Sequence, residues 1–305
     1  MGETNRDKQQ EKTLAEAFEL NRPRLLRIAY TLTGSLAEAE DCVQEAWLRL
    51  RGISDPSGIR NLAAWLTTTV SRLALDSLGS ARTRREQYVG TWLPEPLVGD
   101  QSQDPADRVT LDESVSMALL VVLEKLSPAE RTAFVLHDVF GVPFPEVAEI
   151  VGRTPGAVRQ LASRARRRVE DGQPVSPPST SEQRKLVAAF AAACDTGDLP
   201  GLIALLDPDV VLRSDGGGKV EALRYEVRKA DRIAPMMLAR TAMFGSLNSV
   251  PTEVNGAPGL VLRSPHGEIS VLAFTFDAGR ITAIDAIRNP DKLARVPRVQ
   301  NNTWN

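Results

Sequence analysis

The sequence predicts a multidomain protein in which two all-α domains are followed by an α+β domain. Apolar residues recur at helical spacing through most of the first 172 residues. Two stretches, 88–110 and 173–181, are rich in proline and small or polar residues, which is typical of linkers. After residue 182 two helical stretches precede a run of alternating segments, which indicates helices on one face of a curved sheet.

Composition limits the classes of function. The chain has 305 residues, enough for two or three domains, with ordinary hydrophobic (42%) and charged (25%) fractions. The formal net charge is -2, so nucleic-acid binding has to rest on local clusters. Arginines do cluster, at residues 82–85 and 153–168.

Cysteine usage and apolar runs give further expectations. Cys42 and Cys194 are the two cysteines, too few for a disulfide framework or a zinc cluster, so we expect a reduced cytoplasmic protein without metal or cofactor. The polar start, residues 1–12, is unlike a signal peptide. The longest apolar run, residues 117–123, is too short to span a bilayer, and no membrane partner is expected.

The amino-terminal part predicts three helices. Two lie between residues 14 and 50 and are separated at Gly34, and a third covers 61–78. In the third, Leu62, Trp65, Leu66, Val70 and Leu73 form the expected apolar seam, whereas Thr67, Thr68, Ser71 and Arg72 form the outer face.

The linker 88–110 contains an unusual apolar segment, WLPEP at 92–96. Exposed tryptophan and leucine are uncommon in a flexible tether. Two interpretations remain open, namely a segment that folds back on a neighbouring domain and a docking sequence.

Residues 111–172 predict a second helical domain. Ser127 and Glu130 match a capping box. The stretch 143–169 predicts a helix-turn-helix, with a turn at Gly152 and a second helix that is N-capped by Thr154. Basic amphipathic helices are often only solvated surface, but the turn, the cap and the one-sided arginines together favour DNA binding.

The carboxy-terminal part predicts helices at 182–195 and 199–206, a strand at 209–214, a glycine turn at 215–219 and a helix at 226–243. Further strands are expected at 259–263, 269–276 and 281–287. Val271, Ala273, Phe274 and Phe276 either line a small apolar cavity for a ligand or simply fill a core.

Three stretches of the helical half resemble bacterial sigma factors of the extracytoplasmic-function group. Residues 41–50 (DCVQEAWLRL) are similar to that family's core-polymerase helix, 64–76 to its promoter-melting helix, and 157–166 to its minus-thirty-five helix. The resemblance implies binding of core RNA polymerase and of promoter DNA at the minus-ten and minus-thirty-five elements.

The remaining part resembles the SnoaL-like fold, a cone-shaped α+β barrel, as a regulatory extension of the sigma unit. WLPEP (92–96), DGGGK (215–219) and NPDKL (289–293) are similar to three motifs of a sigma subgroup with this extension. The implied domains are region 2 (12–87), a linker (88–110), region 4 (111–172), a linker (173–181), the SnoaL-like domain (182–293) and a tail (294–305).

The candidate residues fall into three sets. For DNA they are Arg60, Asn61, Arg72, Arg82, Arg84, Arg85, Arg159, Gln160, Ser163, Arg164 and Arg167, and for polymerase Asp41, Gln44, Glu45 and Leu48. For regulatory contacts they are Trp92, Leu93, Pro94, Glu95, Pro96, Asp215, Gly216, Gly217, Gly218, Lys219, Asn289, Pro290, Asp291, Lys292 and Leu293. The free protein is expected to be monomeric.

Two alternative functions remain. A SnoaL-like enzyme would need a general acid or base, and the available residues are His266, Asp209, Asp215 and Asp285, among which no pair can be assigned. A ligand-sensing one-component repressor would not need the helix 41–50. We therefore expect no catalytic residues and a sigma factor in place of an enzyme.

Overall fold

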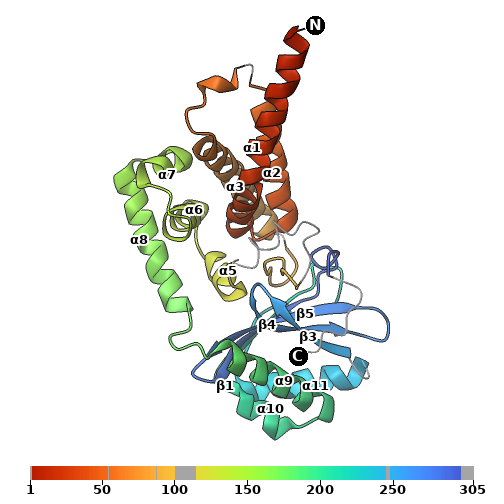
Figure 1. Ribbon diagram of the computed structural model, residues 1–305. Coiled ribbons are helices and arrows are strands. Elements are labelled where there is room, and N and C mark those ends of the chain that lie inside the picture. The colour runs from red at the N-terminus through yellow and green to blue at the C-terminus, as the bar shows by residue number, and fades with distance from the viewer. Residues whose placement is uncertain (1, 54, 87, 100–114, 245–247, 297–305) are drawn as a thin grey trace. The chain divides into compact units, whose positions relative to one another are not determined.

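The computed structural model describes residues 2–53, 55–86, 88–99, 115–244 and 248–296. Its amino-terminal half is helical, as predicted (Figure 1). The elements are α1 (Gly2–Thr33), α2 (Leu36–Arg51), the 3-10 helix η1 (Pro56–Gly58), α3 (Leu62–Glu86), α5 (Met117–Leu123), α6 (Pro128–Phe134), the π-helical turn η2 (Val135–Val139), α7 (Phe144–Val151) and α8 (Pro155–Gly172). None of the helices in the described part is long and apolar enough to cross a membrane.

Local signals in the sequence explain several helix starts. Ser35 caps α2 by accepting a hydrogen bond from the backbone N–H of Glu38, which confirms the break predicted at Gly34. The capping box of α6 is also confirmed, because Ser127 and Glu130 each bond the other's backbone N–H.

Helix α3 departs from the prediction in two ways. It continues to Glu86 through the basic run at 81–85, since no proline or glycine follows Gly79 there to end it. Its buried side also includes Thr67 and Ser71, which were expected on the outer face, whereas Trp65 is only half-buried. Thr67 tolerates burial because its hydroxyl donates to the carbonyl of Ala63.

The carboxy-terminal half has the α+β architecture expected of the SnoaL-like fold. A six-stranded curled sheet has the order β2-β1-β6-β5-β4-β3, with β1 and β6 parallel and all other neighbours antiparallel. The elements are α9 (Thr180–Thr196), α10 (Leu199–Leu205), β1 (Leu206–Asp215), β2 (Val227–Arg228), α11 (Ala230–Phe244), β3 (Asn248–Val254), β4 (Ala257–Arg263), β5 (Ile269–Asp277) and β6 (Arg280–Ile287). The helix predicted from 226 therefore begins at Ala230, because Val227 and Arg228 pair with β1.

Each face of this sheet has its own apolar core. Helices α9, α10 and α11 cover one face, where Phe190, Ile233 and Phe274 are buried (Figure 1). The opposite face buries Val271 and Ala273 together with side chains from outside the domain predicted at 182–293. These are Leu93 and Val98 of the linker, Met117 and Val121 of α5, and Val296.

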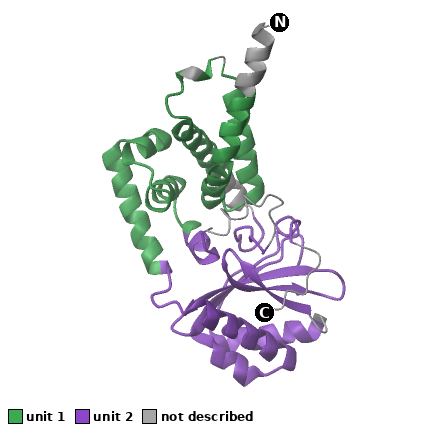
Figure 2. Cartoon of the chain, in the orientation of Figure 1, with its two compact units in different colours: residues 1–83, 104–114, 123–171 green, residues 84–103, 115–122, 172–305 purple. Residues whose placement is uncertain are grey.

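Contacts divide the chain into two compact units (Figure 2). The first holds residues 1–83, 104–114 and 123–171, and the second holds 84–103, 115–122 and 172–305. These limits differ from the predicted domain limits, because most of the linker and the beginning of α5 pack with the carboxy-terminal sheet.

The aromatic core under α9 gives a stability prediction. Phe274 packs edge-on against Phe190, with ring centroids 5.1 Å apart. We expect Phe274→Ala to destabilise the second unit by about 3–5 kcal/mol, since it removes a large buried side chain and leaves a cavity. Hydrogen exchange measured on strands β1 and β4–β6 would show this loss, whereas Val175→Ala, at a 91% exposed position, should leave exchange unchanged.

Candidate functional site

The helix-turn-helix predicted from the sequence is present as α7 and α8. Gly152 ends α7 in the left-handed conformation with φ of 68°, which favours glycine. Thr154 accepts a hydrogen bond from the N–H of Ala157 at 3.3 Å and so caps α8. One side of α8 is buried, and the predicted readers on its other side are all exposed.

The arginines of α8 fall into groups with different partners. Arg164 and Arg168 both pair with Glu130 of α6, at 3.4 and 2.9 Å. Arg166 pairs with Asp138 of η2. The Arg159 guanidinium lies 5.5 Å from the ring centre of Phe144 in α7, within reach of a cation–π interaction. The sequence did not predict these ion pairs or this cation–π contact.

The candidate DNA-binding residues of the first helical domain are not all free of contacts within the protein. Arg60 is exposed, whereas Asn61 caps α3 by accepting from the N–H of Ala64 at 3.1 Å. Arg72 donates to the backbone carbonyl of Glu149 in α7 at 3.1 Å. Arg82, Arg84 and Arg85 belong to the last turns of α3, and their side chains lie outside the described part of the structure.

The predicted polymerase-binding face on α2 is accessible. Asp41, Gln44 and Leu48 are exposed, and Leu48 is notable as an apolar side chain with 51% exposure. Glu45 pairs with Arg49 one turn later at 2.9 Å. The face therefore places acids beside an exposed leucine.

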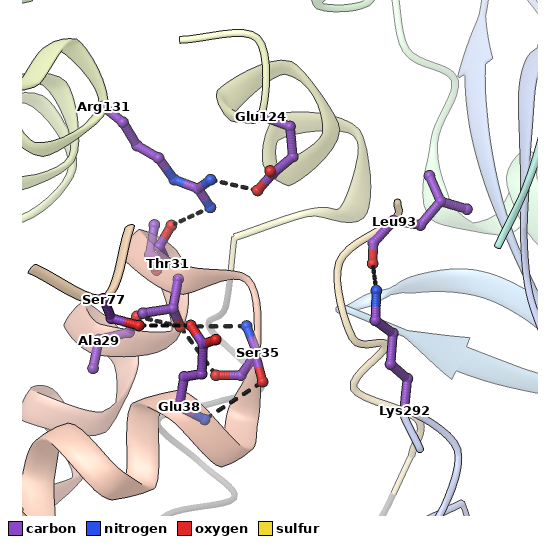
Figure 3. A network of polar contacts seen from close by, with 10 residues as sticks. Ala29, Thr31, Ser35, Glu38, Ser77, Leu93, Glu124, Arg131 and Lys292 are labelled. Atoms are coloured by element: carbon purple, nitrogen blue, oxygen red, sulfur yellow. Dashed lines mark hydrogen bonds and ion pairs between the residues drawn. The ribbon is translucent and has the colours of Figure 1, made fainter. Parts of the chain in front are cut away.

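A buried arginine joins the two helical domains within the first unit. Arg131 of α6 is only 2% exposed, pairs with Glu124 and donates to the carbonyl of Thr31 near the end of α1 at 3.1 Å (Figure 3). Sequence reasoning missed it, since an arginine inside a helix is usually solvated. A second arginine contact also joins the two helical domains. The Arg27 guanidinium lies over the Phe140 ring, 5.3 Å from its centre, within reach of a cation–π interaction.

A fully buried carboxylate, that of Asp215, organises the three regulatory motifs of the second unit. It accepts hydrogen bonds from the Tyr88 hydroxyl at 2.5 Å, the N–H of Leu93 at 2.9 Å and the N–H of Gly217 at 3.0 Å. Its charge is balanced by Lys292, whose Nζ lies 2.7 Å away. Segments 92–96, 215–219 and 289–293 therefore meet at one point.

Lys292 holds the linker with several further contacts. Its Nζ donates to the carbonyl of Leu93 (Figure 3) and lies 3.9 Å from the centre of the Trp92 ring, a close cation–π contact. Asn289 donates to the Tyr88 hydroxyl at 2.9 Å. Burial raises the pKa of Tyr88, and its hydrogen bond to Asp215 raises it further, so the phenol is neutral.

The other motif residues surround this centre. A Cβ on Gly217 would lie 2.5 Å from the Asn289 side chain, so the close approach there requires glycine. Lys219 and Asp291 form an exposed pair at 2.7 Å. Tyr88 was not predicted, although an aromatic residue just before the WLPEP segment was an available signal. Pro94, Glu95, Pro96, Gly216 and Leu293 are buried, whereas Gly218 and Pro290 are exposed.

The linker also pairs with the sheet. Leu97 accepts from the N–H of Asn255 at 2.8 Å, and Gly99 donates to the carbonyl of Glu253 at 2.9 Å. Val98 forms a bridge with Val254 at the end of β3. The WLPEP segment thus folds onto the carboxy-terminal sheet, the first of the two interpretations that the sequence left open.

Val271, Ala273, Phe274 and Phe276 fill the two cores of the sheet and do not line one cavity together, which is the second of the two interpretations that the sequence left open. Successive side chains of a strand point to opposite faces, so Val271 and Ala273 lie on the face away from Phe274 and Phe276. A cavity of about 30 Å³ does exist beneath the helices, and this is roughly the room of one water molecule. Leu272, Arg240, Thr241, Cys194 and Asp195 are among its lining residues.

The residues considered for catalysis do not meet in this cavity. Asp285 is buried against Arg213 at 2.6 Å, and Asp215 is held by Lys292. Asp209 and His266 are exposed. None of these four carboxylate and imidazole groups lines the cavity beneath the helices. Among the described residues no group of His, Cys, Asp and Glu could hold a metal ion.

Two family models match the helical half. The model described as Sigma-70 region 2 matches residues 17–84, and the model described as Sigma-70, region 4 matches residues 116–169. The matches cover the helices that carry the candidate DNA and polymerase residues. The helical half is therefore that of a bacterial sigma factor.

Comparison with known proteins extends the match to nearly the whole chain. It is 41% identical over 297 residues to the ECF RNA polymerase sigma factor SigJ of Mycobacterium tuberculosis, covering 92% of this chain and 93% of SigJ. A crystal structure of SigJ superposes with a TM-score of 0.74 at 39% identity and covers 93% of this chain and 100% of that one. The probable sigma factor SigI of the same species is 37% identical and covers 93% of this chain and 96% of SigI. The chain belongs to the ECF RNA polymerase sigma factors, and its carboxy-terminal extension has the α+β architecture described above.

The buried Asp215–Lys292 pair gives a second prediction. Lys292→Met should destabilise the second unit by about 3–5 kcal/mol, because it leaves a buried carboxylate without its counter-charge. The double variant Asp215→Asn with Lys292→Met should recover most of this loss, since no charge then stays buried. Hydrogen exchange measured in urea on strands β1 and β4–β6 tests this, and equal losses in the single and double variants would contradict it.

Proposed function

We propose that this sigma factor meets the transcription machinery through one surface on each helical domain, under the control of its SnoaL-like domain. The network around Asp215 carries the regulatory part of the proposal, because it ties the linker between the two helical domains to the carboxy-terminal sheet. We further propose that the free protein is a monomer in the cytoplasm, where polymerase and DNA are found, and that the SnoaL-like domain is not catalytic.

The promoter surfaces are proposed from charge and exposure. On α8 the readers of the minus-thirty-five element are Arg159, Gln160, Ser163, Arg164 and Arg167, which share its exposed side. At the minus-ten element we assign Arg60, Asn61 and Arg72 to the opened strand and Arg82, Arg84 and Arg85 to phosphates. Asn61 and Arg72 would have to exchange their present partners for DNA.

Polymerase binding is proposed for the exposed face of α2. The residues are Asp41, Gln44, Glu45 and Leu48. The acids can attract a basic surface of the partner. Burial of the exposed leucine against an apolar patch of that surface would add favourable binding free energy.

Control by the SnoaL-like domain is proposed to act through the reach of the linker. The chain on both sides of residues 100–114 is held on one sheet face, by Leu93 and Val98 of the linker on one side and by Met117 and Val121 of α5 on the other. A linker fastened at both ends spans less than a free one, so the fastened state is the restrained state.

The polymerase assignment predicts that reversing the acids weakens assembly. Asp41→Lys with Glu45→Lys should lower the affinity for core RNA polymerase by about 10-fold or more, since it places like charges in the interface. Binding of fluorescently labelled protein to purified core measures this. A reversal on the exposed start of α11, Asp231→Lys, serves as the control, and equal affinities for all three proteins would exclude α2 as the docking helix.

The regulatory assignment predicts that releasing the linker raises transcription. The double variant Asp215→Asn with Lys292→Met should keep the sheet folded but loosen the linker, which loses its contacts with Lys292, so promoter-dependent run-off transcription with core polymerase should increase severalfold. Lys219→Ala breaks only the exposed pair with Asp291 and should change nothing. Unchanged or lower output from the double variant would refute control by restraint.

A further inference from the structure

One carboxylate, that of Glu130, links the start of α6 to the DNA-facing helix α8. Glu130 is 7% exposed. Its Oε2 accepts from the N–H of Ser127 at 3.1 Å, from the Ser127 hydroxyl at 2.8 Å and from Arg168 Nη1 at 2.9 Å. Its Oε1 lies 3.4 Å from Arg164 Nε. Both carboxylate oxygens are therefore engaged, and two arginines one turn apart share a single anchor.

The electrostatics of this anchor favour its charged form. Burial by itself would raise the pKa of Glu130, but the hydrogen bonds from Ser127 and the charges of Arg168 and Arg164 lower the pKa below its usual value. The carboxylate is therefore ionised at neutral pH and holds both arginines there.

The way in which Arg164 is held leaves part of its guanidinium available. The ion pair uses Nε, which is the inner edge of the guanidinium, and the side chain is still 58% exposed. The Nη groups are the part of an arginine that grips the two acceptors of a guanine edge. An arginine that is oriented before binding loses less conformational freedom when it meets a base.

We propose that Glu130 is a positioning residue for promoter reading, which orients Arg164 so that its outer donors meet one base pair of the minus-thirty-five element. This inference rests on the proposed function of α8. Glu130 itself touches no DNA and acts through Arg164, with Arg168 completing the anchor.

The substitution Glu130→Gln isolates this role. Glutamine also completes a capping box, so the start of α6 is kept while the charge that holds Arg164 is lost. Ser127→Ala is the matched control, because it removes the capping hydroxyl but leaves the carboxylate for the arginines. Arg164→Lys keeps a positive charge beside Glu130 but loses the guanidinium fork.

The experiment uses holoenzyme formed from full-length protein and core polymerase on a promoter library randomised across the upstream element. Sequencing of the transcribed templates gives the preference at each base pair. Arg164→Ala identifies the base pair that Arg164 reads. At that base pair Glu130→Gln and Arg164→Lys should each reduce discrimination by about 10-fold, and Glu130→Gln should add nothing to Arg164→Ala. Ser127→Ala should keep the preference.

Three results would overturn the inference. They are an unchanged preference in Glu130→Gln, a loss at a base pair other than that of Arg164, or an equal loss in Ser127→Ala, which would mean a purely structural role. Failure of the proposed function looks different. In that case neither Arg164→Ala nor alanine at Arg159, Gln160, Ser163 or Arg167 changes any preference, and the role of Glu130 falls with it.

Discussion

The ion pair between Lys292 and the fully buried carboxylate of Asp215, at 2.7 Å, is the constraint on which the second unit depends. A buried carboxylate is tolerable only when its charge is balanced and its oxygens are hydrogen-bonded. Asp215 meets this condition by using groups from two distant segments, the linker and the segment 289–293, and the N–H of the adjacent Gly217. The requirement that one strand-end carboxylate be satisfied thus becomes a requirement that the linker stay in place. The Lys292 ammonium also lies over the rings of Tyr88 and Trp92, so the linker contributes cation–π contacts as well as hydrogen bonds.

Much of the fold followed from the sequence because its signals are local. The break at Gly34, the capping box at Ser127 and the turn at Gly152 each depend on a few neighbouring residues, and all three are present. The errors arose where distant parts of the chain decide. Val227 joined a strand only because it pairs with Leu212 of β1, which its own neighbours in the sequence do not indicate. The strand pattern left open whether Val271 and its neighbours line a cavity or fill a core, because that depends on which elements pack on each face of the sheet.

The candidate sites show the same division. Charge and helical periodicity predicted which side of α8 is exposed, and the motifs predicted which segments belong together. Neither could show that Glu130 gathers two arginines or that Arg131 is buried beside the end of α1. Both residues are charged and sit in an ordinary helical pattern, so their roles depend on which helices pack against α6. Similarity to SigJ supports the family and the overall arrangement of elements.

Helix α5 has a consequence for how this architecture can change in evolution. The region 4 match begins at residue 116, yet Met117 and Val121 complete the core of the carboxy-terminal sheet. The extension is therefore not a detachable cassette, since its hydrophobic interior is encoded in part upstream of the helix-turn-helix. A recombination event that exchanged only the sequence after residue 172 would pair a new sheet with foreign linker side chains. Such chimaeras should succeed only when the segment around residues 88–122 is inherited from the same parent, so linker and extension are expected to be transmitted as one heritable block.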